Sequence, residues 1–477
     1  MTNPYRTERD SLGEMQVPRD AVHGIHTARA LENFAITGVR LSHFPELVRA
    51  LAMVKKAAAL ANRDLGVLDA ERADAITEVC DEIIAGSHHE HFVVDMIQGG
   101  AGTSTNMNAN EVIANLALGK LGRKRGEYAW MHPNDHVNRS QSTNDVYPTA
   151  IRLAVLAKCE QLIGEQTRLS RAFAERAQTF SDILKVGRTQ LQDAVPITLG
   201  SEFASYAATI DEDVERVGQL SELLKEVNLG GTAVGTGINA PAGYAARAVA
   251  HLSEVSGYRL VSASDLIEAS SDLGAFVTFS GVLKRIAVKL SKICNDLRLL
   301  GSGPRAGIGE ILLPPVQAGS SIMPGKVNPV IPEVVNQVCY QVIGNDLTVT
   351  MAAEAGQLQL NAMEPVMIFN ILDSIRILSR AMAVLTDRCV IGIEADAGRC
   401  AALLRGSLVL ATALAPVIGY ENASKVAKVA QADGSSIAEA AVKLGLISES
   451  ELDEAFSPER VLGPAGNVVR PSDGTAT

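Results

Sequence analysis

The middle of the sequence carries helical periodicity over segments much longer than an ordinary helix. Five segments repeat apolar residues at helical spacing: 149–180, 199–229, 270–300, 329–360 and 365–390. Pro148 marks the expected start of the first, and Gly230 and Gly301 the ends of the second and third. The mean α-helix has about 11–12 residues, and segments twice that length are typical of helix bundles. The sequence therefore predicts a mainly α-helical protein with a central long-helix bundle.

Composition supports this prediction and adds an oligomer to it. Hydrophobic residues make up 47% of the chain and aromatic residues only 4%, so the core must be aliphatic, which favours helices over a β-sandwich. Apolar residues lie on more than one face of the segment VIPEVVNQVCYQVIG (330–344). One intramolecular contact cannot bury them all, and we expect a homo-oligomer.

The length of 477 residues predicts about three domains. Shorter helical runs predict an N-terminal domain at 1–142, the bundle occupies 143–393, and a small helical domain follows at 394–477. Within the last domain we expect two short helices, capped at Ser435 or Ser436 and at Ser448 or Ser450. Residues 463–477 are rich in Gly, Pro, Ser and Thr and are expected to be disordered.

Charge and cysteine usage exclude several classes of protein. The net charge of −11 argues against a nucleic-acid partner. The six cysteines are scattered and form no C-x-x-C pair, which is typical of a reducing compartment. The most apolar uncharged stretch, 407–420, contains Pro416 and is too short to span a bilayer. We therefore expect a soluble, cytoplasmic protein with no membrane partner.

Three motifs suggest nucleotide or metal binding only weakly. GTGINA (235–240) and GSGPRA (301–306) fit a loose dinucleotide pattern but lack its strand–helix–strand context. GSSIMPGK (319–326) has the wrong spacing for a phosphate-binding loop. His88, His89 and His91 could hold a metal, but a short run of histidines is more often a solvated face. We predict no metal site.

Five loops rich in hydroxyl and amide groups are more informative: 99–111, 132–149, 186–196, 230–239 and 317–329. Two of them place a basic residue, Arg188 or Lys326, close to hydroxyls, which indicates a pocket for a small carboxylate. The last loop combines flexible Gly319 and Gly325 with restrictive prolines, a pattern typical of a lid. It carries Ser320, which could act as a base only if N–H groups or a cation stabilise its alkoxide.

Ordered sequence blocks resemble the aspartase/fumarase superfamily over nearly the whole chain to about residue 460. They are VPRDAVHGIHTARALENF, GTSTNMNANEVIAN, HPNDHVNRSQSTND, GRTQLQDAVP, GGTAVGTGIN and GSSIMPGKVNP. His26-Thr27, Gln190 and the segment 351–365 resemble aspartases more closely than class II fumarases. Fumarate hydratase is the alternative function, and a structural protein without activity is a third possibility, because members of the superfamily have been recruited for that role.

This resemblance implies a three-domain fold and a homotetramer. Five helices per subunit would form a twenty-helix core, and each active site would combine loops from three subunits. The implied reaction is the reversible deamination of L-aspartate to fumarate and ammonia through an aci-carboxylate intermediate. It needs no cofactor, with a divalent metal such as Mg²⁺ as an activator only.

The resemblance also implies roles for individual residues. Ser320 corresponds to the catalytic base. The donors to the β-carboxylate would be Thr103, Ser142, Thr143 and Ser321. Lys326 and Asn328 would anchor the α-carboxylate. The amino group would be held by Asn144, Thr189 and Gln190.

Overall fold

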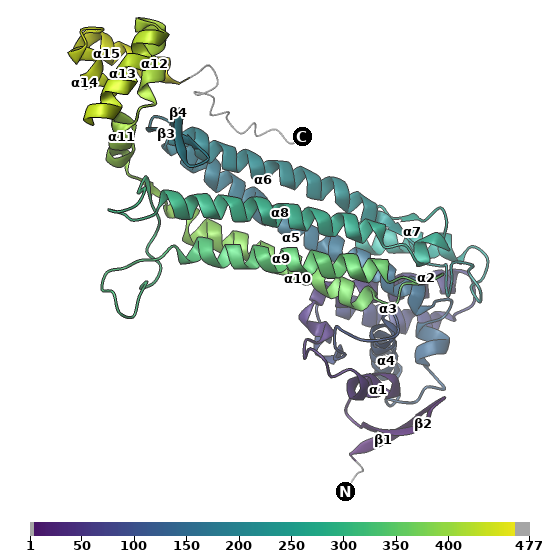
Figure 1. The fold of residues 1–477 in the computed structure, drawn as a ribbon. Coiled ribbons are helices and arrows are strands. Elements are labelled where there is room, and N and C mark those ends of the chain that lie inside the picture. Colours follow the sequence, from purple (N-terminus) through teal and green to yellow (C-terminus); the bar gives the residue numbers. More distant parts are fainter. Residues whose placement is uncertain (1–3, 463–477) are drawn as a thin grey trace. The chain divides into compact units, whose positions relative to one another are not determined.

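Five long helices dominate the computed structural model, which describes residues 4–462 (Figure 1). They are α5 (Thr143–Thr179), α6 (Leu199–Ser221), α8 (Gly274–Leu300), α9 (Val330–Glu354) and α10 (Glu364–Arg388). The prediction of a mainly helical protein with unusually long helices is confirmed. Two expected ends are wrong: α6 stops at Ser221, before a 3-10 turn and strand β5 (Glu226–Val227), and α9 stops at Glu354.

The expected start of the first long helix is also wrong, because Pro148 lies inside α5. Proline cannot donate the N–H that would bond the carbonyl four residues earlier, which here belongs to Asn144. The side chain of buried Asn228 donates to that carbonyl instead, over 3.0 Å. A distant amide thus replaces the missing helical bond and lets the helix begin at Thr143.

The long helices contact one another through polar pairs as well as apolar packing. Each pair joins two different helices: Ser170–Ala207 (α5–α6), Tyr206–Asp296 (α6–α8), Ser291–Asn336 (α8–α9), Asn345–Ser374 (α9–α10) and Arg168–Asp387 (α5–α10). Every helix of the five contacts two others in this way, which is the arrangement of a five-helix bundle.

The described residues divide into two compact units, each built from three stretches of chain. Unit 1 holds residues up to 163, 215–285 and 341–378, and unit 2 holds 164–214, 286–340 and the described residues from 379 onward. The domain limits expected from the sequence, 1–142, 143–393 and 394–477, stay predictions.

Unit 1 contains a hairpin and a layer of shorter helices. Its helices outside the bundle are α1 (Ile25–Asn33), α2 (Pro45–Asp64), α3 (Ala70–Ile84), α4 (Thr103–Lys120) and α7 (Tyr244–Ser256). Strands β1 (Tyr5–Asp10) and β2 (Gly13–Pro18) pair antiparallel, and β5 pairs parallel with β6 (Val261–Ser262). Short turns of helix lie at Leu41–His43, His89–His91, Pro133–Val137, Glu222–Lys225 and Glu268–Ser270. Helix α2 packs against both α3 and α7, so most of its surface is buried.

Unit 2 contains two small antiparallel pairs and a group of short helices. The strands are β3 (Leu184–Thr189) with β4 (Gln192–Thr198), and β7 (Ile311–Leu312) with β8 (Glu394–Ala395). A 3-10 turn at Val390–Gly392 precedes α11 (Ala397–Gly406), α12 (Leu410–Ile418), α13 (Tyr420–Asp433), α14 (Ile437–Lys443), α15 (Glu449–Ala455) and α16 (Pro458–Val461).

The short C-terminal helices share an apolar core that includes Val186 of β3. Ser436 and Ser448 cap α14 and α15, each in a reciprocal capping box with the glutamate three residues on, Glu439 and Glu451. The two predicted short helices and their caps are therefore confirmed. The segment 463–477, expected to be disordered, lies outside the described residues.

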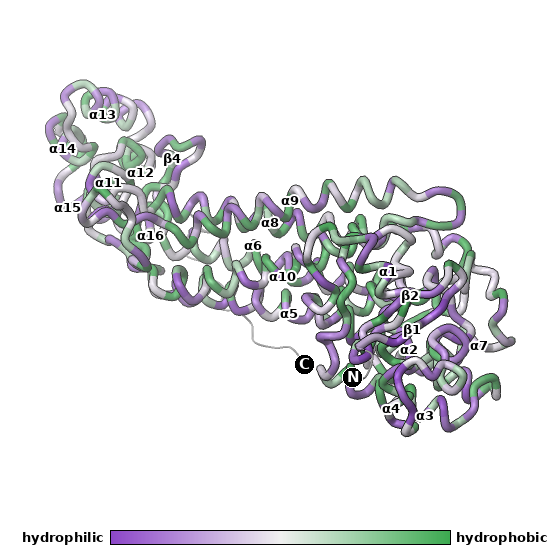
Figure 2. The backbone as a smooth tube through the Cα atoms, turned by 90° about the horizontal axis from the view of Figure 1, so that it is seen from below, coloured by the Kyte–Doolittle hydropathy of each residue, from purple (hydrophilic) through white to green (hydrophobic). Residues whose placement is uncertain are grey.

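Hydrophobic and hydrophilic residues alternate along the long helices (Figure 2). All six cysteines are free and buried. Between residues 4 and 462, no single helix is both long and apolar enough to cross a bilayer, although α11 and α12, bent by 56°, meet the length and composition criteria as a pair.

Candidate active site

Two helix N-termini in unit 1 carry hydroxyl residues predicted for the site. Thr103 begins α4 and Thr143 begins α5, so only the first residues of segment 99–111 form a loop, contrary to expectation. Asn106 of α4 donates to the Thr143 hydroxyl over 3.0 Å and ties the two helix starts together. Unpaired N–H groups at a helix N-terminus favour a bound carboxylate.

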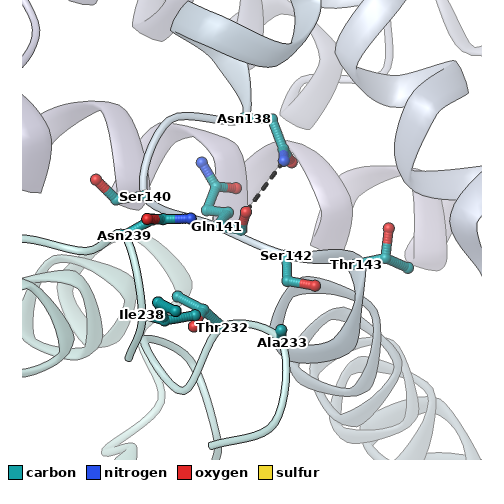
Figure 3. A pocket seen from close by; sticks show the side chains of 9 residues that line it. All are labelled: Asn138, Ser140, Gln141, Ser142, Thr143, Thr232, Ala233, Ile238 and Asn239. Atoms are coloured by element: carbon teal, nitrogen blue, oxygen red, sulfur yellow. Dashed lines mark hydrogen bonds between the residues drawn. The ribbon is translucent and has the colours of Figure 1, made fainter. Parts of the chain in front are cut away.

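A polar cavity of about 330 Å³ opens beside the start of α5 (Figure 3). Its lining is Asn138, Ser140, Gln141, Ser142, Thr143, Thr232, Ala233, Ile238 and Asn239. The side chain of Asn144 donates to the Ala233 carbonyl over 2.7 Å, so its amide oxygen is the atom it can offer to a bound ammonium group. The size and polarity of this cavity suit a small dicarboxylate or amino acid.

Two buried charges organise the wall of this cavity from behind. Lys55 is fully buried and donates to the side-chain oxygens of Asn138 and Gln141, both over 2.9 Å. Burial lowers the pKa of Lys55 to about 7. Asp145 accepts the backbone N–H groups of residues 142, 230 and 232 over 2.9, 2.9 and 3.1 Å. Burial raises the pKa of Asp145 to about 6, and its three bonds join the two loops that line the cavity.

The residues 186–196, expected as a loop, form the hairpin β3–β4 in unit 2. Thr189 ends β3, and Gln190 and Leu191 form a two-residue turn with φ of 54° and 61°. Positive φ at both positions is the geometry of a type I′ turn, normally filled by Asn and Gly. A glutamine and a leucine here are strained, and such strain is concentrated at functional sites. The turn leaves Thr189 and Gln190 exposed.

Residues 313–329 connect β7 to α9 and include the segment 317–329 that the sequence predicts to be a lid. Two hydrogen bonds hold the two ends of the loop together, and we call this point the neck. The Gly319 N–H donates to the Lys326 carbonyl over 2.8 Å, and Asn328 Nδ2 donates to the Gly319 carbonyl over 2.7 Å. A side chain at Gly319 would bring its Cβ within 2.5 Å of the Lys326 oxygen, so only glycine fits. Ser321 and Lys326 are exposed beyond this neck.

Ser320, the predicted base, lies at the tip side of the neck in a defined local geometry. Its Oγ accepts the backbone N–H groups of Ile322 and Met323 over 3.2 and 3.0 Å. Two N–H dipoles aimed at one oxygen stabilise negative charge on it. The structure therefore supplies the donors that a serine base requires.

A buried acid joins the hairpin to the root of the lid loop. Glu310, fully buried, lies 3.0 Å from Lys185 Nζ and 2.9 Å from an Arg188 guanidinium nitrogen. Lys185 also bonds Glu202 over 2.6 Å. Arg188, which the sequence analysis noted as a basic residue close to hydroxyls, is paired with Glu310, and the hairpin is anchored next to the residue where β7 begins.

The ten residues proposed from the sequence fall into two groups. In unit 1, Ser142 and Thr143 line the cavity, Asn144 bonds the lining residue Ala233, and Thr103 begins α4. Unit 2 carries the other six, on the hairpin (Thr189, Gln190) and on the lid loop (Ser320, Ser321, Lys326, Asn328). Their assembly into one site stays a prediction.

Sequence reasoning missed Lys55, Asn138, Asp145 and Asn228, which hold the cavity in shape. The one available signal was the position of Lys55 within the helical stretch ALAMVKKAAALA (50–61), which is apolar apart from Lys55 and Lys56.

Comparison with known proteins decides the family. A family model described as a lyase matches residues 13–344, and one described as the fumarase C C-terminus matches 410–463. An aspartate ammonia-lyase from Pseudomonas canavaninivorans is 59% identical over 461 residues, covering 96% of this chain and 97% of the relative. One from Escherichia coli K12 is 52% identical and covers 99% of each chain. This chain belongs to the aspartate ammonia-lyase family.

Solved structures agree with this membership in the aspartate ammonia-lyase family. A fumarate lyase:delta crystallin from Brucella melitensis, determined bound to cobalt, is 61% identical with a TM-score of 0.93, covering 94% of this chain and 98% of that one. A class II fumarase from Schistosoma mansoni shares the fold at a TM-score of 0.90, covering 95% and 98% of the two chains, but only 33% of the sequence. The aspartate ammonia-lyases are thus more similar to this chain than the fumarase is, as the sequence blocks predicted.

Proposed function

We propose that this chain catalyses the reversible deamination of L-aspartate to fumarate and ammonia, with Ser320 as the base. The observation that carries the proposal is the pair of backbone N–H groups, from Ile322 and Met323, that point at Ser320 Oγ. They lower the cost of the alkoxide without placing a charged side chain beside it. Identity of 52–59% to aspartate ammonia-lyases over nearly the full chain supports the substrate.

The difficult step is the removal of a weakly acidic Cβ proton. Ser320 takes this proton, and the electron pair delocalises into the neighbouring β-carboxylate as an aci-carboxylate. The carboxylate must therefore be held more tightly as its charge grows. Thr103 and Thr143, each at a helix N-terminus, supply hydroxyl and N–H donors for this purpose, with Ser142 and Ser321 as further hydroxyls.

Five further residues hold the rest of the substrate in this proposal. Lys326 provides the charge that pairs with the α-carboxylate, and Asn328 adds an amide donor beside it. The amide oxygen of Asn144, together with Thr189 and Gln190, accepts from the ammonium group. Collapse of the aci-carboxylate then breaks the Cα–N bond and releases ammonia, leaving fumarate.

We further propose a cytoplasmic homotetramer whose active sites combine loops of three subunits. An exposed apolar row on α9 supports this, because Tyr340, Leu347 and Met351 share one face of the helix and are between 59% and 65% exposed in the isolated chain. A surface row of this kind is typical of a subunit interface. We assign no cofactor, no nucleic-acid partner and no membrane partner to the reaction, and Mg²⁺ enters as an activator only.

One assay separates the candidate functions. Purified protein is given L-aspartate or L-malate, and fumarate is followed by its ultraviolet absorbance. A signal with aspartate supports the proposal, a signal with malate alone indicates a fumarase, and none with either indicates a structural protein.

The base is tested by Ser320→Ala, with Ser205→Ala, at an exposed serine of α6, as the matched control. We expect kcat to fall by roughly 10²–10⁴ for Ser320→Ala and to stay unchanged for Ser205→Ala. Sedimentation should give the same oligomer for both. Near-normal turnover of Ser320→Ala would assign the base to another residue.

A further inference from the structure

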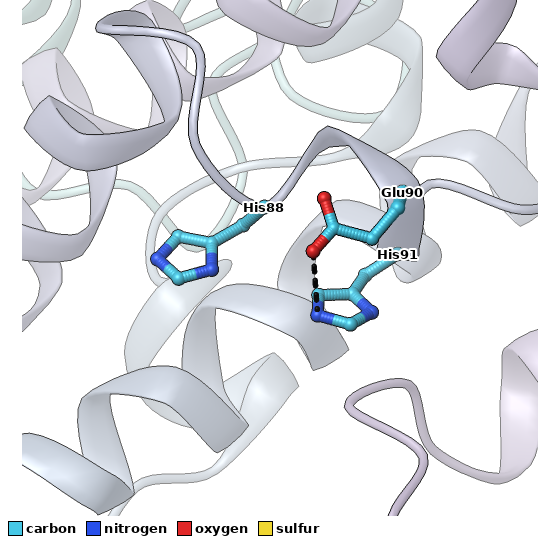
Figure 4. Close-up of side chains that lie close together, drawn as sticks. All are labelled: His88, Glu90 and His91. Carbon is cyan, nitrogen blue, oxygen red and sulfur yellow. Dashed lines mark ion pairs between the residues drawn. The ribbon is translucent and has the colours of Figure 1, made fainter.

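Three side chains of unit 1 converge outside the proposed active site. His88, Glu90 and His91 lie on and beside the short helix His89–His91, between α3 and α4. One potential ligand atom of each lies within 4.8 Å of the other two. Figure 4 shows the carboxylate of Glu90 and the rings of both histidines turned toward a common point. Among residues 4–462, no other group of three His, Cys, Asp or Glu side chains meets this spacing.

The His88 ring is already oriented as a metal ligand would be. Its Nε2 lies 2.8 Å from Glu82 Oε2, on α3. Lys120 bonds the other oxygen of Glu82 and fixes that carboxylate in place. Because Glu82 occupies Nε2 of His88, Nδ1, on the side facing Glu90, is the ring nitrogen that is left to serve as a ligand (Figure 4). A carboxylate behind a histidine is the usual support of a histidine–metal bond.

His91 is the second nitrogen ligand and is fixed through its backbone. Asn108 of α4 donates to the His91 carbonyl over 3.1 Å and accepts the Val93 N–H over 2.9 Å. His91 Nε2 lies 3.5 Å from Glu90 Oε1, close to the separation of two ligands that share a metal at about 2.0–2.1 Å.

We propose that His88 Nδ1, Glu90 Oε1 and His91 Nε2 form a binding site for a divalent transition-metal ion such as Zn²⁺ or Co²⁺. Two imidazoles and one carboxylate are the ligands these ions prefer, whereas Mg²⁺ requires an octahedron of oxygens that the cluster does not offer. Three protein ligands leave a coordination position for water or another small ligand. The site is separate from the proposed chemistry at Ser320 and does not depend on it.

The test is a titration of the full-length protein with Co²⁺, followed by its visible absorbance, and with Zn²⁺ by calorimetry. We expect one ion per chain at this site. His91→Ala should abolish the Co²⁺ spectrum of the site, and Glu82→Gln should weaken binding roughly 10- to 100-fold, since it removes only the support of His88. His89→Ala is the matched control, because His89 Nε2 faces the Ile83 carbonyl instead, over 2.8 Å.

The proposal is overturned if His91→Ala binds Co²⁺ as the unmodified protein does, or if His89→Ala weakens binding as much as His91→Ala. Competition by millimolar Mg²⁺ against micromolar Co²⁺ would also contradict it, because an oxygen-ligand site would then be responsible. Circular dichroism of each variant identifies any loss of binding that comes from unfolding. If His91→Ala does not fold, Glu82→Gln still tests the proposal, because Glu82 is not itself a metal ligand.

Discussion

The bond between Asn228 and the Asn144 carbonyl offers a sharp test of how α5 begins. Asn228→Ala removes the donor that replaces the missing N–H of Pro148, and it leaves a carbonyl unpaired beside the cavity. Leaving a buried acceptor unpaired costs about 1–3 kcal/mol. The cost should appear as easier local opening of the first turns of α5, with amide exchange there roughly 5- to 100-fold faster.

Pro148→Ala should compensate for the loss of the Asn228 hydrogen bond. Alanine at position 148 can donate its own N–H to the Asn144 carbonyl, which has two lone pairs and therefore accepts both donors in the single variant. Pro148→Ala alone should change exchange little. In the double variant the restored helical bond should recover about 0.5–1.5 kcal/mol of the loss.

The assay is hydrogen exchange followed by mass spectrometry on peptides that cover residues 143–152, for all four members of the double-mutant cycle. Asn345→Ala, which removes a buried amide bonded to Ser374 on other helices, serves as the control and should show no coupling to Pro148→Ala. Strict additivity of Asn228→Ala and Pro148→Ala would refute the reasoning, because the two residues would then act on different groups.

Three further outcomes are expected. Glu310→Gln removes the shared partner of Lys185 and Arg188 and should cost up to roughly 3–5 kcal/mol; calorimetry should show a clearly lower Tm, and an unchanged Tm would mean that the cluster contributes no stability. The pKa of Lys55 is about 7 in the folded chain and 10.5 in the unfolded chain, so between these pH values the unfolded chain binds the extra proton and the free energy of unfolding should rise with pH, by at most about 5 kcal/mol. Thermal unfolding of Lys55→Met at several pH values should not show this rise. The same pH profile in the variant as in the unmodified protein would contradict the assignment. Lys326→Ala should reduce kcat/KM for aspartate by an amount that corresponds to a loss of about 2–5 kcal/mol in transition-state stabilisation. An unaltered KM would count against the role of Lys326 as the α-carboxylate anchor.

The features that the sequence predicted correctly depend on local chemistry. Long helices follow from apolar spacing, and the caps Ser436 and Ser448 follow from a serine placed three residues before a glutamate. The candidate residues Ser142, Thr143 and Asn144 came instead from the resemblance of their sequence block to a known family; Ser142 and Thr143 line the cavity and Asn144 bonds the lining residue Ala233.

The errors arose where a distant residue replaces what local chemistry lacks. Pro148 looked like a helix start, and only Asn228, far along the chain, lets it lie inside α5. The turn at Gln190–Leu191 contains no glycine, so nothing local marked it as a hairpin, and its left-handed backbone depends on the strands that it joins. The burial of Lys55 likewise depends on distant segments, because α3 and α7 pack against α2.

The sequence by itself determined the helical class and the family, and it supplied the residues proposed for the site, because periodicity and motif order depend on the order of residues along the chain. Only the tertiary structure decided which charges are buried behind the cavity and which cations are already paired. Burial and pairing are properties of surfaces brought together from distant segments. No single stretch of the chain records them.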